Sequence, residues 1–133
     1  MLKIIDSGAR SNLPFSPAFQ AGELMFVSGQ ASVDRESGAI ITGTFEEEMR
    51  RSIENLRAIL NAGGLSLDHV INVKSYVANE ADLALYNQIY PDYFSEPRPS
   101  RSTIVGVLGT KLKFELDCVA HSGATRQQAE RIA

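Results

Sequence analysis

The stretch that decides the fold is PRPSRSTIVGVLGTKLKFELDCVAHSG, which runs from Pro97 to Gly123. It predicts two strands joined by a tight turn that contains glycine. The second strand alternates between an apolar face and a face with two carboxylates. The apolar face holds Phe114, Leu116, Cys118 and Ala120, and the other face holds Glu115, Asp117, Val119 and His121. A face with two carboxylates meets either water or a partner that needs them, so it is the first candidate for a functional surface.

The bulk composition predicts one soluble globular domain that spans residues 1–133. The chain has 133 residues, of which 44% are apolar and 22% charged, and this suits one domain with a real core. Its net charge of −3 disfavours a nucleic-acid partner, because proteins that bind nucleic acids carry basic patches.

Cysteine content and hydropathy predict a cytoplasmic location. The single cysteine, Cys118, cannot form an internal disulfide, and we expect it to be a buried thiol in a reducing compartment. No apolar run approaches the roughly 20 residues of a membrane span, so no membrane partner is expected. Asp6 and Arg10 interrupt the region where a signal peptide needs a continuous apolar core.

The first third of the chain predicts short strands and loops. These are an edge strand at 2–5, a loop at 7–20, a strand at 24–28 that continues over 31–33 past a bulge at Gly29, a polar turn at 34–38 and a hairpin return strand at 39–41.

A capped amphipathic helix follows. Thr44 and Glu47 form a capping box, and Gly63 with Gly64 predicts the end of the helix. Between them apolar residues recur at three- and four-residue spacing, which predicts a stripe packed on the core. The stripe comprises Phe45, Met49, Ile53, Leu56 and Leu60.

The next elements are a strand at 71–78 and a second helix at 81–94, which Asn79 can cap and which Pro91 should kink or end early. This order predicts an α+β domain in which both helices cover one face of a mixed sheet. The uncovered face carries apolar residues beside polar ones, and leaving it bare would be costly. Oligomerisation through the sheet is therefore expected.

The sequence contains no Gly-rich phosphate loop, no HExxH and no CxxC. His69 and His121 are isolated, each near a single acid, so no metal site is predicted. Arg101 and Glu115 remain as candidates for catalysis.

Arg101 follows a proline-stiffened loop and offers a permanently charged fork to a substrate carboxylate. Glu115, on what we expect to be the neighbouring strand, lies between two apolar residues and can polarise a water molecule as a general base. The same pair fits a plain cross-strand salt bridge equally well. Asp117 and Lys113 are more simply explained as solvated or interface residues.

Six motifs carry a resemblance, and they cover nearly the whole chain. They are VSGQ (Val27–Gln30), NAGG (Asn61–Gly64), VKSYV (Val73–Val77), YNQIY (Tyr86–Tyr90), PSRST (Pro99–Thr103) and FELDCVA (Phe114–Ala120). In this order they resemble the Rid/YjgF family of reactive-intermediate deaminases, older members of which were labelled L-PSP endoribonucleases. The resemblance covers a core of about 14–123 and leaves a polar tail at 124–133.

The resemblance implies a chorismate-mutase-like fold that assembles as a homotrimer with a central β-barrel. It also implies active sites between subunits, which hydrolyse small carboxylated 2-enamine or 2-imine acids, such as 2-aminoacrylate, to 2-oxo acids and ammonia. No cofactor is implied, because an imine carbon is already electrophilic and the site has only to place water and bind the anion.

The resemblance also assigns roles to single residues. Arg101 matches the arginine that grips the substrate carboxylate, and Glu115 matches the glutamate that orients the attacking water. The substrate-binding matches are Ser28, Gly29, Asn87, Tyr90 and Thr103, the last in the position of a common cysteine whose backbone contributes to the pocket.

Two further departures from the family concern the rim of the pocket. Phe15 stands in PFSPA where the family often has a tyrosine, so a pocket hydroxyl is missing. The turn around 106–110 is one residue shorter than usual. Three functions remain open: a deaminase of 2-aminoacrylate-like acids, a deaminase of another catabolic enamine such as an aminomuconate-type intermediate, and a non-catalytic trimer that binds a small metabolite.

Overall fold

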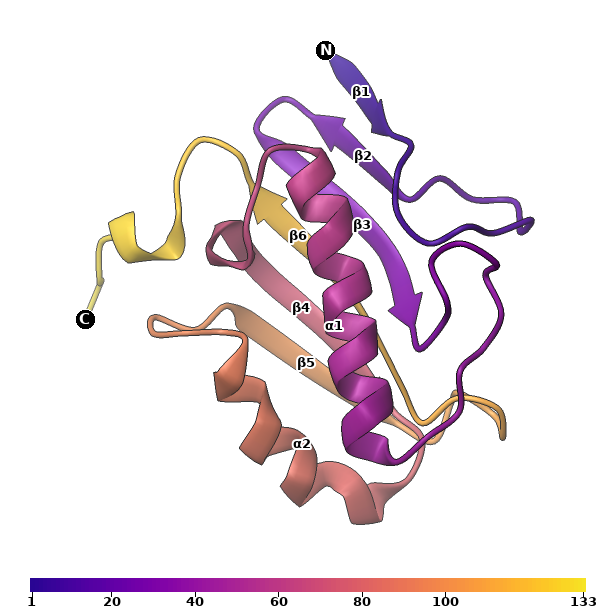
Figure 1. Cartoon of the computed structure of the whole chain (residues 1–133). Helices are drawn as coiled ribbons and strands as arrows, with labels where there is room; N and C mark the ends of the chain where they lie inside the picture. The colour runs from indigo at the N-terminus through magenta and orange to yellow at the C-terminus, as the bar shows by residue number, and fades with distance from the viewer.

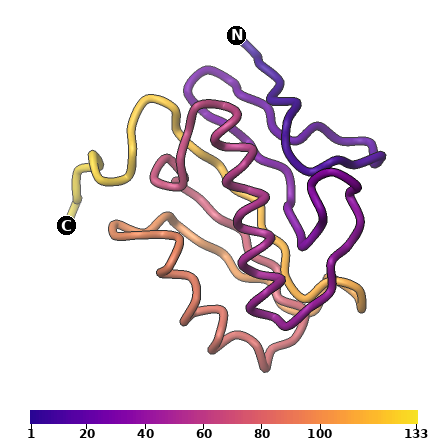
Figure 2. The backbone as a smooth tube through the Cα atoms, viewed as in Figure 1, coloured from indigo at the N-terminus to yellow at the C-terminus, as the bar shows by residue number.

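The computed structural model describes all residues from 1 to 133 and consists of one mixed sheet with two helices on it (Figure 1, Figure 2). The six strands are β1 (Leu2–Ile5), β2 (Ala18–Ala21), β3 (Leu24–Ala31), β4 (Val70–Val77), β5 (Ser100–Val105) and β6 (Phe114–His121). They lie in the order β1-β2-β3-β6-β4-β5, and only β4 and β5 are parallel. The helices are α1 (Phe45–Ala62) and α2 (Leu83–Ile89).

Helix α1 begins and ends where local chemistry dictates. The Thr44 side chain accepts a hydrogen bond from the Glu47 amide (3.2 Å), and the Glu47 carboxylate accepts one from the Thr44 amide (2.9 Å). These bonds satisfy two donors that the first turn would otherwise leave free. At the far end, Gly64 has a φ of +81°, which favours glycine. The predicted cap and stop are confirmed.

Helix α2 is shorter than its apolar pattern. Proline lacks an amide hydrogen, so the α-helix ends at Ile89 and one turn of 3-10 helix, Tyr90–Asp92, replaces it around Pro91. Asn79 caps the preceding 3-10 turn, Glu80–Asp82, by accepting from the Ala81 amide at 2.9 Å. The expected early end is confirmed.

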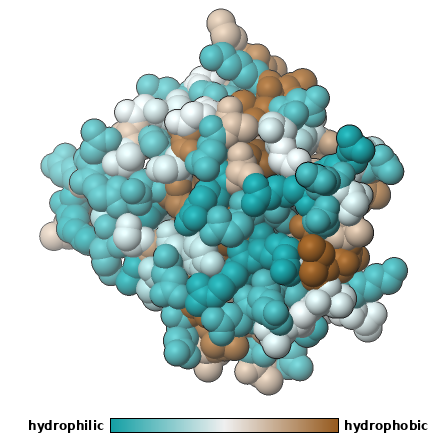
Figure 3. Space-filling model, viewed as in Figure 1, coloured by the Kyte–Doolittle hydropathy of each residue, from teal (hydrophilic) through white to brown (hydrophobic).

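Both helices lie on the same face of the sheet (Figure 1). The hydrophobic core lies between the two helices and the sheet, and every residue on the apolar face of β6 belongs to it. From outside, this helix-covered side is mainly hydrophilic (Figure 3). The α+β class and the placement of both helices on one face are therefore confirmed, while the trimer and its barrel stay predictions.

The opposite sheet face carries exposed apolar side chains. Phe19 on β2 is paired with Phe26 on β3, and their exposed fractions are 40% and 48%. Ile71 and Ile104 add apolar surface on β4 and β5. Exposing such an apolar surface to water is energetically costly, so oligomerisation through this face stays a prediction.

Three sequence predictions differ from the structure. The loop predicted at 7–20 contains β2, which follows directly after Pro17 and pairs with β1 and β3. The hairpin predicted at 39–41 is reduced to one bridge, Val33 to Ile40. The last two strands are not paired: β4 lies between β5 and β6. A strand that follows a crossover helix pairs in parallel with the strand before that helix, and β5 does so with β4.

Replacement of Thr44 by alanine tests the cap. We expect Thr44→Ala to lower the free energy of unfolding by about 1 kcal/mol, because the Glu47 amide loses its acceptor. Urea denaturation measures this difference. Thr42→Ala is the matched control, since Thr42 is exposed and lies outside the helix. An equal loss in both variants would contradict the assigned cap.

Candidate functional site

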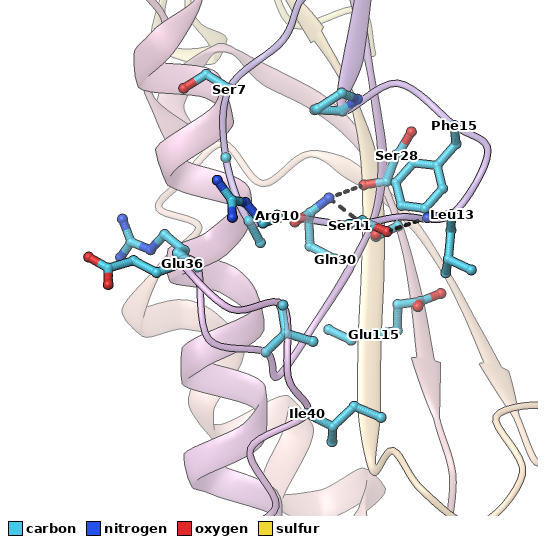
Figure 4. A pocket seen from close by; sticks show the side chains of 18 of the residues that line it. Ser7, Arg10, Ser11, Leu13, Phe15, Ser28, Gln30, Glu36, Ile40 and Glu115 are labelled. Carbon is cyan, nitrogen blue, oxygen red and sulfur yellow. Dashed lines mark hydrogen bonds between the residues drawn. The ribbon is translucent and has the colours of Figure 1, made fainter.

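A cavity of about 1420 Å³ lies where β3 and β6 meet the loop after β1 and the loop before α1. Its lining includes Phe15, Ser28, Gly29 and Glu115. Figure 4 shows Phe15, Ser28 and Glu115 gathered at one end of the cavity. Four of the residues predicted for the site are therefore brought together here.

Glu115 is held on a central strand between two core residues. Phe114 and Leu116 are buried under the helices, so alternation turns Glu115 toward the open sheet face. The side chain is half-buried and makes no hydrogen bond or ion pair within the chain. A carboxylate in this state is free to hold a water molecule or a ligand.

The absence of a side chain at Gly29 leaves room for the Glu115 carboxylate. The pairing of β3 with β6 shifts register between Val27 and Gln30, which is the predicted bulge. A Cβ atom at position 29 would lie 2.9 Å from Oε2 of Glu115. Any larger residue would therefore push the carboxylate aside.

Hydrogen bonds fix the bulge. The hydroxyl of Ser28 donates to the Ser16 carbonyl at 2.6 Å, and its amide donates to the Pro17 carbonyl at 2.9 Å. The side-chain amide of the buried Gln30 donates to the backbone carbonyls of Ser28 and Gly29 at 3.1 and 3.2 Å. The floor of the cavity is thus tied to the loop that carries Phe15.

The surroundings of Glu115 raise its pKa. Loss of hydration is the main cause, and the negative charge of Asp117 on the same face adds to it. Asp117 itself accepts a hydrogen bond from the Tyr76 hydroxyl at 2.8 Å, which raises the pKa of Tyr76 to about 12. Glu115 therefore holds a proton more tightly than an ordinary glutamate, as suits a group that exchanges protons.

Arg101 lies elsewhere, on the helix side of β5. Its Nη2 donates to Oδ1 of Asn87 at 2.9 Å, and its guanidinium lies 4.8 Å from the ring centres of Tyr86 and Tyr90. The Tyr86 hydroxyl shares a 2.9 Å hydrogen bond with Oγ1 of Thr103. The guanidinium is exposed and has no carboxylate partner. It can therefore receive an anion.

Tyr90 contributes its ring to this group. Its hydroxyl is buried without a hydrogen-bond partner, and burial raises its pKa. The ring packs at 5.8 Å from that of Tyr86 and at 4.6 Å from that of Phe94. Tyr90 thus supports the arginine by stacking.

The predicted site residues fall into two groups on opposite faces of the sheet. Phe15, Ser28 and Gly29 lie with Glu115, whereas Asn87, Tyr90 and Thr103 lie with Arg101. Strand β4 separates the two groups, so the expectation that Glu115 is on the strand beside Arg101 is wrong. For the same reason no salt bridge joins them.

Sequence reasoning missed three contributors: Tyr86, Gln30 and Tyr76. The spacing of Tyr86 and Tyr90 places both on one helix face, which is a signal for a stacked platform. The Gln30 contacts are local, with Ser28 and Gly29 of the VSGQ motif. The contact of Tyr76 with Asp117 depends on the pairing of β4 with β6 and left no local signal.

No group of three His, Cys, Asp or Glu side chains gathers in an arrangement that suits a metal ion. None of the helices has the length and apolar character needed to cross a membrane.

The sequence model described as Endoribonuclease L-PSP matches residues 8–122. The chain belongs to the Rid/YjgF family. A RutC family protein of Pyrococcus horikoshii is 36% identical over 109 residues, which are 81% of this chain and 86% of that protein. The 2-iminobutanoate/2-iminopropanoate deaminase of Mus musculus is 31% identical over 111 residues, or 83% of this chain and 82% of the mouse protein.

Among solved structures, E. coli TdcF with bound serine has a TM-score of 0.77 to this chain. It is 26% identical, and the match covers 91% of this chain and 97% of TdcF. The Rid assignment that the six sequence motifs suggested is therefore confirmed.

Replacement of Asp117 by asparagine tests the electrostatics around Glu115 in this Rid-family chain. We expect Asp117→Asn to lower the pKa of Glu115, because loss of a nearby negative charge makes deprotonation easier. NMR titration of the glutamate side-chain carboxyl carbon measures the pKa. Glu130→Gln, which removes a charge from the exposed tail, is the control. A pKa that stays in place or rises in Asp117→Asn would contradict this account.

Proposed function

We propose that the chain is a deaminase that hydrolyses reactive 2-enamine or 2-imine acids, such as 2-aminoacrylate, to 2-oxo acids and ammonia. The observation that carries the proposal is Glu115: a half-buried carboxylate of raised pKa, without a partner, at the wall of a cavity. The deaminase named among the relatives supports it. The exposed guanidinium of Arg101 supplies the charge that the substrate carboxylate needs.

In the proposed reaction, Arg101 binds the carboxylate and Glu115 holds the attacking water. An enamine first gains a proton at C3 from solvent and becomes the protonated imine, in which nitrogen carries the positive charge. The water oxygen then bonds to C2, Glu115 takes one water proton, and the electron pair of the C=N π bond moves to nitrogen, which becomes a neutral amine. Glu115 gives this proton to the amine, the C–N bond breaks, and ammonia leaves with the bonding pair. The hydroxyl of the adduct releases its proton to solvent as the C=O bond of the 2-oxo acid forms, so the carboxylate of Glu115 is regenerated and no cofactor takes part.

The proposed site needs two copies of the chain. Arg101 and Glu115 of one chain lie on opposite sheet faces, so no single substrate can touch both. In a homotrimer closed through the open faces, Arg101 of one subunit would face Glu115 of another. The exposed pair Phe19 and Phe26 would be covered by the same contact.

The cavity also bears on the choice of substrate. Phe15, with 49% of its surface exposed, lines it together with Leu112 and Ile40. This wall is apolar and offers no hydroxyl where the family often has one. It suits imines with apolar side chains, and a larger enamine of the aminomuconate type is a second substrate to assay.

The direct test is an assay with 2-aminoacrylate made in situ from serine by a dehydratase, with pyruvate release as the readout. We expect the wild type to accelerate release above the blank. Arg101→Ala should reduce kcat/KM by roughly 100-fold, the effect of losing charged hydrogen bonds to a carboxylate. Arg131→Ala, at a side chain that is 80% exposed, is the control. A wild type that binds pyruvate without turnover would instead be a metabolite-binding protein.

Mixing two impaired variants tests the shared site. Arg101→Ala and Glu115→Gln should each have only a few per cent or less of the wild-type activity alone (~1% for Arg101→Ala), since each lacks one half of every site. Refolded together in equal amounts, they should recover about a quarter of the wild-type activity, the fraction of sites that combine both intact residues in a ring of subunits. A mixture no more active than its components, or a monomeric mass by light scattering, would overturn the shared site.

A further inference from the structure

The segment after β6 docks on the body of the protein through one arginine. This segment, Ala124–Ala133, lies after the residues 8–122 that match the family. It contains one 3-10 turn, Arg126–Gln128, and Arg126 is only 5% exposed. A buried arginine in an otherwise polar tail requires a physical reason.

The Arg126 guanidinium donates hydrogen bonds to four backbone carbonyls. Nε donates to Pro97 at 2.7 Å, Nη1 donates to Leu67 and Val70 at 2.6 and 2.8 Å, and Nη2 donates to Ser95 at 3.1 Å. The Asp68 carboxylate lies 3.7 Å from Nη2. Burial lowers the pKa of Arg126, and the charge of Asp68 acts against this shift. The guanidinium stays charged because nearly every donor has an acceptor.

The four acceptors lie at the beginnings of two neighbouring strands. Leu67 and Val70 lead into β4, while Ser95 and Pro97 lead into β5. These strands are parallel partners, and β5 is an edge strand whose only neighbour is β4. Arg126 therefore holds together the two chain segments from which the β4–β5 pairing starts.

Arg101 is the functional residue on the strand that is held. It lies four residues after Pro97, and its guanidinium stacks on Tyr90. The charges of Arg101 and Arg126 both act on the Tyr90 hydroxyl to lower its pKa, against the larger effect of burial. Tyr90 thus stacks against the exposed Arg101 and lies near enough to the buried Arg126 for its hydroxyl to sense that charge as well.

We propose that Arg126 is a positioning residue for substrate binding: it fixes the start of β5 and thereby the place where Arg101 meets the substrate carboxylate. This inference rests on the proposed function only in giving Arg101 its role. Loss of the clamp should leave Glu115 in place, because Arg126 contacts β4 at Val70, which pairs with Ala120, and Glu115 lies at the opposite end of β6. The effect should therefore fall on binding of the carboxylate and spare the chemical step.

Hydrogen exchange tests the clamp without reference to activity. In Arg126→Met we expect the amides of residues 100–105 to exchange about tenfold faster, with those of β3 and β6 unchanged. Arg126→Lys should lie between it and the wild type, because an ammonium group reaches fewer of the four carbonyls. Arg131→Gln is the control in the same tail. If Arg126→Met fails to fold, the comparison of Arg126→Lys with Arg131→Gln decides the same question.

Ligand binding tests the link to Arg101. Calorimetry with pyruvate should give a Kd about tenfold weaker in Arg126→Met, with kcat within about twofold of the wild type. In an Arg101→Ala background, Arg126→Met should cause no further loss of affinity, because the two residues act through one contact. A purely structural role would give additive losses.

The inference and the proposed function fail in different ways. Unchanged exchange in residues 100–105, a uniform rise in all strands, or additive losses in the double variant would each overturn the clamp. A wild type that neither binds pyruvate nor accelerates its release would overturn the proposed function, and the exchange experiment would still decide whether Arg126 holds β5.

Discussion

The structure depends on the crossover that carries the chain from β4 through α2 to β5. Because this connection makes β5 parallel to β4, the other side of β4 is left for β6. Two strands that follow each other in sequence are therefore separated in the sheet by a third. Alternation along β5 and β6 then sends Arg101 to the helix side and Glu115 to the open side. The separation of the two charges within one chain is thus a consequence of topology.

This separation preserves the chemical state of both residues. Had Arg101 and Glu115 met within one chain, each would have neutralised the other, and the pKa of Glu115 would have fallen. Instead, Glu115 is kept unpaired between Gly29 and Asp117, and loss of hydration raises its pKa. The Arg101 guanidinium stacks on two tyrosines and has no carboxylate partner within the chain. Each side chain keeps its capacity for a ligand, which a salt bridge within the chain would have consumed.

The features that the sequence predicted correctly are those that depend on residues close together in the chain. The alternation of 114–121, the Thr44 cap and the stop before Pro91 each depend on neighbours in sequence, and all three are confirmed. Gly106 and Gly109 do adopt positive φ values, yet their turn does not pair the strands that flank it. Which strand inserts between them is decided by residues 70–77, far away in sequence. The roles proposed for Asn87 and Thr103 came from family resemblance alone, and the Tyr76–Asp117 contact had no sequence signal.

The C-terminal segment shows how an edge strand can be stiffened without another strand. The carbonyls of Ser95 and Pro97 accept no backbone amide, because the chain there has not yet joined the sheet. Unpaired carbonyls of this kind need a donor, and a guanidinium offers several in one rigid plane. Arg126 satisfies them and joins them to the start of β4 at the same time. The cost of burying its charge is offset only while all these carbonyls converge, so the arginine stabilises one arrangement of β4 and β5 against every other.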